Sequence, residues 1–577
     1  MKVLFIDPDF YHWGFSDPKS TTNFAFVVVG TYLKVHGQEV EILDMPGQKI
    51  SYEELPQKIK ERNPDIVGIP SSMNCYIPES LKVARIAKSV NPNIVTIGGG
   101  INFTLNSESI MKLCPELDFI VRGDGEYTAL ELVQTLEFSG EKNLSGILGL
   151  TWRDSESIIL NSDRPPIMDL DSLPSPDWSL IDFNRYRLDL FPPKWGEQAL
   201  FITSRGCPWN CRFCAPVRAS QNTYREWSAE RTVEELVRLR RKYGRRMIWM
   251  NDLTFGVNED RTIKLCEGII KEKLDLNICV DTRVDIVIKR KDILPLMRKA
   301  GFRLLAMGVE SPLEKDQQKS EKIKPWMDMP ASAKEAVKLL QKNKINSWCY
   351  HMWGESEHSP EDVRAIFKCA DELDSDFLVL AHIVPHPGTP YYDEMKDDLV
   401  TDDLAWFGED TPVLRNQYMT DNQMRMLYIE MYHNYFIKPS RLVRKLIFGT
   451  EYSRWWYKLM SDANKNWGIV LRQMWQERLG WQGFGTKEEE ESLRKWARDV
   501  LGVPWSTRAL MKLGDLLGRL FVRDELPTTL RSGLTCPQKT GPNTILDGGF
   551  YEQEDVWIRA DHQQAGSSGN LTGRGTG

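Results

Sequence analysis

Three cysteines stand close together between Arg205 and Cys214, and their spacing constrains this chain more than any other feature. Cys207, Cys211 and Cys214 are separated by three residues and then by two, so one tight loop can bring three thiolates to one small cluster. The next cysteine, Cys266, lies far along the chain. Structural zinc takes four closed ligands, and a cubane iron-sulfur cluster normally takes four thiolates. Three thiolates therefore leave one iron of a cubane open to a small molecule.

Three other interpretations of these cysteines stay open. A disulfide is typical of secreted chains, whereas this sequence shows no secretory signal. A three-cysteine zinc site would need a histidine, and the nearest, His351, is distant in sequence. A chance grouping of buried cysteines is the third. Soft thiolate ligands in this spacing favour an iron-sulfur cluster over all three.

The stretch resembles the cysteine motif of the radical S-adenosylmethionine (SAM) superfamily, and Phe213 before the third cysteine also matches that family. The resemblance implies a 4Fe-4S cluster bound by Cys207, Cys211 and Cys214, whose open iron takes the amino and carboxylate groups of SAM. One-electron reduction then cleaves SAM to methionine and a deoxyadenosyl radical. The family also implies a ferredoxin or a flavodoxin as the electron donor.

Composition excludes several classes of function. A length of 577 residues predicts two to four domains. The net charge of −7 argues against a general nucleic-acid-binding protein, which would show a basic excess. No run of eighteen apolar residues occurs, so we expect no transmembrane segment. Ten cysteines without a secretory signal indicate the reducing cytoplasm.

Residues 1–140 alternate between short apolar strands and helices. Strands are expected at 2–7, 39–43, 65–69, 94–97 and 118–121, with helices at 24–36 and 81–90. This alternation predicts an α/β domain with a Rossmann-like parallel sheet wound on both faces, and ligands of such sheets bind outside the carboxyl ends of the strands. The candidate contacts there are Ser71, Ser72, Gly98, Gly99, Gly100, Gly123, Asp124, Gly125 and Glu126.

Each of these turns taken alone is an ordinary tight turn. Together, and placed before the cysteine motif, they resemble the cobalamin-binding domain of the cobalamin-dependent radical SAM class, with 122–126 as the most telling match. The resemblance implies bound cobalamin. The second strand ends at Asp44 without the Asp-x-His-x-x-Gly histidine that ligates cobalt in many cobalamin domains, so the lower cobalt face is expected to be open or held by water or another side chain. His12 is one candidate, although a lone loop histidine is more often solvated.

Residues 141–195 contain the proline-rich stretches 164–166 and 173–178 and are predicted to link two domains. Residues 196–400 hold six strand-helix units, with strands expected at 200–204, 247–250, 277–283, 303–309, 346–352 and 377–384. A capping box at 232–235 is expected to open the helix that follows the cysteine loop. Six units predict a partial parallel barrel, whose chemistry lies at the carboxyl ends of its strands.

Polar residues at those strand ends are suited to binding SAM. Acceptors for its ammonium and ribose hydroxyl groups are Asn251, Asp252, Glu310 and Ser311. Arg283 can pair bidentately with its carboxylate. By resemblance, the SAM site is lined by Phe213, Asn251, Arg283, Glu310 and Ser311. The alternative for Arg283 and Glu310 is a structural ion pair at the barrel mouth. No catalytic acid or base stands out, and the candidates are His351, His382 and His386.

Residues 401–530 are predicted to form a helical region rich in tyrosine and tryptophan, with one amphipathic helix over 424–435. Such a cap either packs on the barrel or shapes an aromatic substrate pocket. Residues 531–577 lack apolar periodicity, and 563–577 are rich in glycine, serine and threonine. We expect this tail to be largely disordered.

The order of the parts resembles the subfamily of the anaerobic magnesium-protoporphyrin monomethyl ester cyclase, in which many relatives are carbon methyltransferases. The resemblance implies an enzyme that functionalises an unactivated carbon, and methyl transfer through methylcobalamin is the reaction it favours. Two alternatives are an oxidative cyclase without methyl transfer and a cobalamin or cluster sensor without turnover. The expected substrate is a small molecule, flat or hydrophobic, which the sequence does not name.

Overall fold

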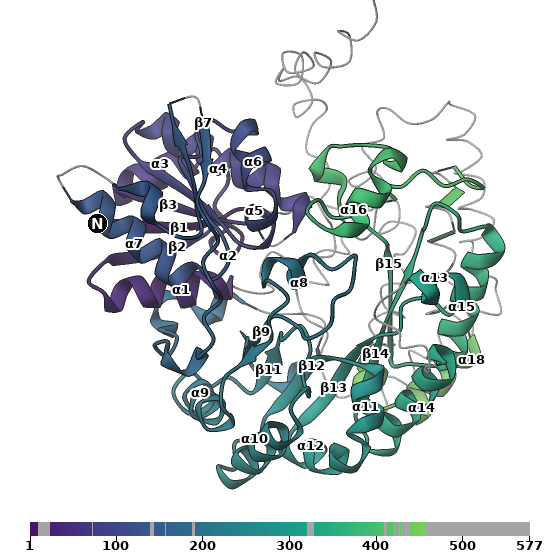
Figure 1. Ribbon diagram of the computed structural model, residues 1–577. Helices are drawn as coiled ribbons and strands as arrows, with labels where there is room; N and C mark the ends of the chain where they lie inside the picture. Colours follow the sequence, from purple (N-terminus) through teal and green to yellow (C-terminus); the bar gives the residue numbers. More distant parts are fainter. Residues whose placement is uncertain are drawn as a thin grey trace, which may run out of the picture.

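The computed structural model describes residues 1–9, 23–71, 73–138, 143–155, 157–186, 191–319, 328–408, 412–420 and 439–456, with single residues between 423 and 435. His12, Ser72 and the predicted disordered tail lie outside the described residues, as does most of the predicted tryptophan-rich region. Figure 1 shows an N-terminal domain beside a curved second domain, with helix α8 (Ala215–Ala219) between them.

A seven-stranded sheet forms the N-terminal domain, in the order β2-β1-β3-β4-β5-β6-β7. Its parallel strands are β1 (Lys2–Asp7), β2 (Glu39–Asp44), β3 (Ile66–Pro70), β4 (Val95–Gly99) and β5 (Phe119–Val121). Two antiparallel strands, β6 (Leu150–Asp154) and β7 (Ser157–Leu160), complete one edge. These two strands come from the segment predicted to be a linker, so the sheet continues beyond residue 140.

Helices cover both faces of this sheet, which confirms the doubly wound prediction (Figure 1). The alternation of side chains along β1 explains the arrangement, because Val3 and Phe5 join one apolar cluster while Leu4 and Ile6 join another. The first cluster contains residues of α1 (Phe24–Val35) and α7 (Gly125–Glu137). The second contains residues of α3 (Leu55–Arg62), α4 (Ile77–Val90) and α6 (Ser107–Leu113).

Six parallel strands in chain order form the partial barrel. They are β8 (Gln198–Phe201), β11 (Met247–Met250), β12 (Asn277–Arg283), β13 (Phe302–Gly308), β14 (Asn346–Trp353) and β15 (Phe377–His382). The main helices between them are α9 (Ala229–Arg241), α10 (Glu259–Lys271), α11 (Val284–Lys289), α12 (Leu294–Ala300), α14 (Met329–Lys342) and α15 (Pro360–Leu373).

The predicted capping box at 232–235 was wrong, because α9 begins one turn earlier. Ser228 is the N-cap residue, and its hydroxyl accepts a hydrogen bond from the Arg231 amide at 3.1 Å. Inside the helix, Thr232 donates back to the Ser228 carbonyl at 2.8 Å. Glu235 accepts a hydrogen bond from the Trp178 indole at 2.5 Å, and so attaches the helix to the connecting segment.

Part of the predicted helical cap lies within the described residues. Helix α18 (Pro439–Phe448) is followed by Tyr452, Trp455 and Trp456, which are buried in one cluster with barrel strand residues. Trp456 meets Phe377 of β15 edge to face at 4.5 Å. These aromatic residues therefore act as core, as the simpler of the two interpretations expected. No helix in the described part of the chain combines the length and apolarity needed to cross a bilayer.

Candidate functional site

The cysteine loop begins where β8 reaches the carboxyl end of the barrel. A short strand, β9 (Ser204–Arg205), pairs antiparallel with β10 (Arg225–Glu226) and closes the loop at its base. Gly206 follows with φ +74°, and a Cβ there would lie 1.8 Å from the Thr223 carbonyl oxygen. Only glycine allows this close approach of the two ends of the loop.

Asp252, at the end of β11, anchors the chain just before the cysteines. One of its oxygens accepts hydrogen bonds from the Thr203 and Ser204 amides at 2.6 and 2.9 Å, and the other accepts from the Thr203 hydroxyl at 2.6 Å. Burial raises the pKa of Asp252 despite these bonds and the nearby Arg261. Both oxygens accept hydrogen bonds from the chain before the cysteines, so this residue holds the loop in place. Its predicted contact with SAM stays a prediction.

The three thiols lie at the end of the barrel where the carboxyl ends of its strands meet. Cys207 and Cys211 are buried, Cys214 is half-buried, and all three are free of disulfides. The Cys207 sulfur lies 3.3 Å from the Thr254 hydroxyl, a contact that sequence reasoning missed. The described residues contain no group of three or more His, Cys, Asp or Glu side chains already arranged around one metal ion. The fit to a 4Fe-4S cluster therefore rests on the chemistry of three soft donors in one loop.

Arg205 joins the start of this loop to the N-terminal domain. Its guanidinium donates to Asp124 at 3.0 Å and to Glu126 at 2.5 Å. Asp124 also pairs with Arg225, from the strand opposite. Burial alone would raise the pKa of Asp124, but the charges of Arg205 and Arg225 outweigh it and lower the pKa.

These ion pairs change the interpretation of the 122–126 motif. Every carboxylate oxygen of Asp124 and Glu126 accepts a hydrogen bond from the second domain, mostly from arginine. Arg122 instead fastens the edge strands, donating to Thr151 at 2.6 Å and pairing with Asp163 at 2.8 Å. The motif therefore attaches the two domains and the sheet edge. That Gly123, Asp124, Gly125 and Glu126 also contact cobalamin stays a prediction.

The other side of the cysteine loop is attached to the segment after β15. The backbone carbonyl of Arg212 accepts a hydrogen bond from the Tyr391 amide at 3.3 Å. The guanidinium of Arg212 lies 4.8 Å from the centre of the Tyr391 ring and forms an ion pair with Glu394 of α16 (Pro390–Met395). The Tyr391 hydroxyl donates to Glu355 at 2.6 Å. Phe213, predicted to line the SAM site, packs against a small cluster that contains Tyr391.

The remaining predicted SAM residues surround the carboxyl ends of β11, β12 and β13. Arg283 pairs with Asp285 at 2.8 Å, and its guanidinium lies 4.2 Å from the Trp209 ring of the cysteine loop. Glu310 is buried and has φ +63°, a conformation that costs about 1 kcal/mol or more and clusters at functional sites. Ser311 is buried beside Glu310, and its hydroxyl oxygen accepts from the Leu313 amide at 3.2 Å. Asn251 is exposed. Their contacts with SAM stay a prediction.

The three candidate histidines occupy different surroundings. His351 is fully buried in β14, and burial lowers its pKa to about 4. The His382 ring lies 4.1 Å from Trp353, within an aromatic cluster. His386 lies between the domains, where Asn74 donates to it at 3.0 Å and burial lowers its pKa to about 4. Burial thus favours the neutral form of His351 and His386 at pH 7.

The carboxyl edge of the N-terminal sheet offers buried polar atoms to a ligand. Asn74 Oδ1 and Asn102 Nδ2 are buried and have no hydrogen-bond partner among the described residues. Gly100, at the same edge of the sheet, has φ +109°, and a Cβ there would lie 2.6 Å from the Ser71 carbonyl oxygen. A ligand could therefore approach the backbone of Gly100 closely at the edge that also offers the unpaired acceptor Asn74 Oδ1 and the unpaired donor Asn102 Nδ2. A large ligand with amide side chains, as cobalamin is, fits this edge. Sequence reasoning missed both asparagines, although each follows a strand by a few residues.

Comparison with known proteins gives both domains a family. A sequence profile described as the B12 binding domain matches residues 18–133, and one described as the Radical SAM superfamily matches residues 201–370. The chain thus combines one region that matches the B12 binding domain with a second region that matches the Radical SAM superfamily. The first match covers β2 to β5 of the doubly wound sheet, and the second covers the cysteine loop and most of the barrel.

Similar proteins extend over both domains. An uncharacterized methyltransferase of Pyrococcus horikoshii is 29% identical over 413 residues, covering 71% of this chain and 86% of that protein. The anaerobic magnesium-protoporphyrin IX monomethyl ester cyclase of Rubrivivax gelatinosus is 27% identical over 447 residues, covering 77% and 78%. The solved structure of the methyltransferase TsrM from Kitasatospora setae, with cobalamin and a 4Fe-4S cluster bound, gives a TM-score of 0.61 at 16% identity, covering 82% of this chain and 99% of that one. At 16% identity, the similarity to the TsrM structure shows a shared fold.

Proposed function

We propose that this radical SAM enzyme binds a 4Fe-4S cluster, SAM and cobalamin, and transfers a methyl group to an unactivated carbon of a small molecule. The observation that carries the proposal is the position of the cysteine loop. Arg205 at its start is bound to Asp124 of the B12-binding domain, while Arg212 in its middle contacts Tyr391 after the last barrel strand. Groups held at the two sheet edges would therefore face one shared space.

The protein residues have distinct parts in such a reaction. When bound, the cluster and SAM supply a carbon-centred radical and cobalamin supplies a methyl group. Cys207, Cys211 and Cys214 would hold the cluster, while Arg283, Glu310 and Ser311 are proposed to bind SAM. The apolar cluster around Phe213 and Tyr391 limits water at the loop. Neutral, buried His351 keeps a charge out of the barrel.

Methyl transfer is favoured by the similarity to curated methyltransferases, among them the protein of Pyrococcus horikoshii. A second candidate, oxidative cyclisation without methyl transfer, is supported by 27% identity to the cyclase over 77% of this chain. Both reactions begin with the same radical, and they differ in what meets the substrate radical next. The barrel and the cysteine loop alone do not distinguish them.

The test is a product count under anaerobic conditions. The reconstituted full chain is given hydroxocobalamin, a strong reductant and SAM labelled in its methyl group. About one equivalent of S-adenosylhomocysteine, with the label on cobalamin, is the result expected of a methyltransferase. Deoxyadenosine alone would contradict methyl transfer and favour the cyclase reaction. Neither product from protein with an intact cluster would overturn both and leave a sensor. Cys211→Ala should abolish both products, and the matched control Cys266→Ala, at a buried cysteine outside the loop, should keep them.

A further inference from the structure

The opposite end of the barrel contains a cavity that the proposed reaction does not use. Its volume is about 750 Å³, within the range of small-molecule sites. The strands are parallel, and the cavity is lined by Asn277 and Asn346, the first residues of β12 and β14, and by Arg303, the second of β13. It therefore lies at the amino ends of the strands, whereas the cysteine loop lies at their carboxyl ends.

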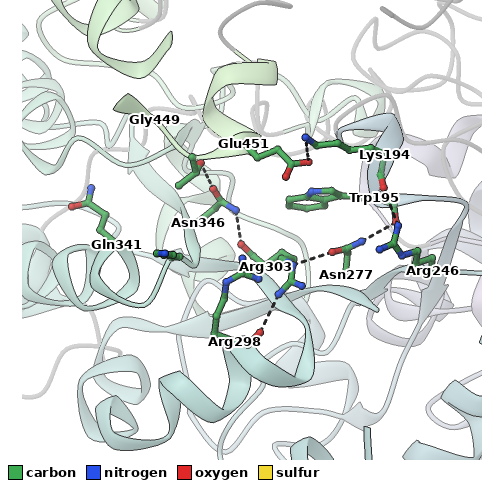
Figure 2. A pocket seen from close by; sticks show the side chains of 12 residues that line it. Lys194, Trp195, Arg246, Asn277, Arg298, Arg303, Gln341, Asn346, Gly449 and Glu451 are labelled. Carbon is green, nitrogen blue, oxygen red and sulfur yellow. Dashed lines mark hydrogen bonds and ion pairs between the residues drawn. The ribbon is translucent and has the colours of Figure 1, made fainter. Parts of the chain in front are cut away.

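Basic side chains dominate this cavity. Five of the lining residues are cationic and one is acidic, namely Lys194, Arg246, Arg298, Arg303, Lys344 and Glu451. Figure 2 shows Arg303, Trp195 and Glu451 around the same space, with Arg298 and Gln341 along one side. Lys194 is paired with Glu451 at 2.9 Å, and Arg246 is paired with Asp275 at 2.9 Å.

The other three cations have no such partner. Within the part of the chain that the structure describes, no carboxylate forms an ion pair with Arg298, Arg303 or Lys344. Arg303 donates to two neutral oxygens, Asn277 Oδ1 and the Arg298 carbonyl, each at 3.0 Å. Burial without an acidic neighbour lowers the pKa of Arg298. Three cationic side chains without an ion-pair partner among the described residues thus line one cavity, and the carboxylate of Glu451 in that cavity is paired with Lys194.

Helix ends explain part of this arrangement. Arg298 lies in the last turn of α12, and Lys344 follows α14 by two residues, so each favourably meets the negative end of a helix dipole. That effect accounts for one cation at each helix and does not require them to face one cavity. Lys299 and Lys342 lie in the same two last turns and do not line the cavity, whereas Lys344 lines it although it too is exposed. The cations that do face the cavity therefore need a further reason.

We propose that this cavity is a binding site for an anionic ligand that carries a phosphate group. Guanidinium groups match the planar, bidentate geometry of phosphate oxygens, and a lysine adds a point charge. Arg298, Arg303 and Lys344 bind the phosphate, and the indole of Trp195 forms the adjoining wall. A free phosphate and the phosphate of a nucleotide share this chemistry.

The C-terminal segment forms one wall of the cavity. Gly449, Thr450 and Glu451 line this wall, and the Thr450 hydroxyl is hydrogen-bonded to Asn346. Glu451 is paired with Lys194, so the phosphate is expected on the opposite side, at Arg298, Arg303 and Lys344.

Calorimetric titration of the full chain with pyrophosphate and with ATP, at constant ionic strength, tests the proposal. Saturable binding is expected, weakened by about tenfold or more in the double variant Arg298→Gln/Lys344→Gln. The matched control Lys299→Gln/Lys342→Gln removes the same charge from the same helix ends and should bind as the parent does. Tighter binding of ATP than of pyrophosphate identifies a nucleotide, and equal binding identifies the phosphates alone.

Two results would overturn this site. One is no saturable binding of either probe at millimolar concentration, and the other is equal weakening in the two double variants, which would mean general electrostatic attraction. Thermal unfolding of the same proteins checks that the variants are folded. Because the readout is binding far from the cysteine loop, it does not depend on methyl transfer being the reaction.

Discussion

Asp124 of the B12-binding domain accepts a hydrogen bond at 3.0 Å from Arg205, two residues before the first cysteine of the loop. The same guanidinium also donates a hydrogen bond to Glu126, and Arg225 forms a second ion pair with Asp124. Two negative and two positive charges thus neutralise one another at a largely buried boundary between the domains. The relationship means that the position of the B12-binding domain and the conformation of the cysteine loop are physically linked.

Breaking this network should destabilise the protein and separate the domains. For Arg205→Met we expect a loss of about 3 kcal/mol in the free energy of unfolding, because buried Glu126 loses its arginine partner and Asp124 keeps only Arg225 as a charged partner. The matched control Lys34→Met breaks the exposed pair between Lys34 and Asp177, and should cost at most about 1 kcal/mol. Denaturant unfolding measures both, and hydrogen exchange should rise across β9 and α7 in the first variant alone. Equal costs would refute a special role for Arg205.

Cluster binding should depend on the cysteines of the loop and not on cysteines in general. Cys214→Ala removes one of three thiolates and should abolish most of the bound iron and the broad absorbance of a 4Fe-4S cluster after anaerobic reconstitution. Cys369→Ala is the matched control, since Cys369 is also half-buried and free. It should retain the parent's iron content. Equal iron in both variants would show that Cys214 is not a ligand.

The interface histidine should make stability depend on pH. Burial lowers the pKa of His386 to about 4, against an ordinary value of 6.5. The unfolded chain therefore binds more protons between pH 6.5 and 4, and stability falls as pH falls through that window. The integrated effect is about 3 kcal/mol by the linkage relation.

Unfolding of His386→Gln between pH 7 and pH 4 measures this effect. The variant keeps a hydrogen-bonding group near Asn74, and its stability should fall less steeply than that of the parent. The control His36→Gln replaces an exposed histidine and should leave the slope unchanged. His351, whose pKa burial also lowers to about 4, contributes a remaining slope in every protein. An unchanged slope in His386→Gln would mean that the ring is accessible to protons in the folded state.

Much of the fold could be predicted from the sequence, because strand runs such as 247–250 are short, apolar and bounded by polar residues. The edge strands β6 and β7 were missed, since Trp152, Arg153 and Asp154 alternate too weakly and lie among loop residues. The roles of Asp124 and Glu126 could not be predicted either. Their partner Arg205 is about 80 residues away, and no local pattern records a contact between domains. Likewise, the start of α9 was predicted at Thr232, whereas Ser228, one turn earlier, caps the helix.

Gly100 and Gly99 provide the sharpest test of the ligand-binding edge of the N-terminal sheet. Gly100→Ala places a methyl group 2.6 Å from the Ser71 carbonyl oxygen at φ +109°, so the turn must shift, at a cost of about 1–3 kcal/mol. Gly99→Ala is the matched control, because its nearest contact, the Val121 carbonyl oxygen, lies at an ordinary 3.7 Å. Titration with hydroxocobalamin, followed by absorbance, should show weaker binding for Gly100→Ala and little change for Gly99→Ala. If Gly99→Ala blocks binding while remaining as stable as the parent, the ligand lies against β4 itself and not against the turn after it.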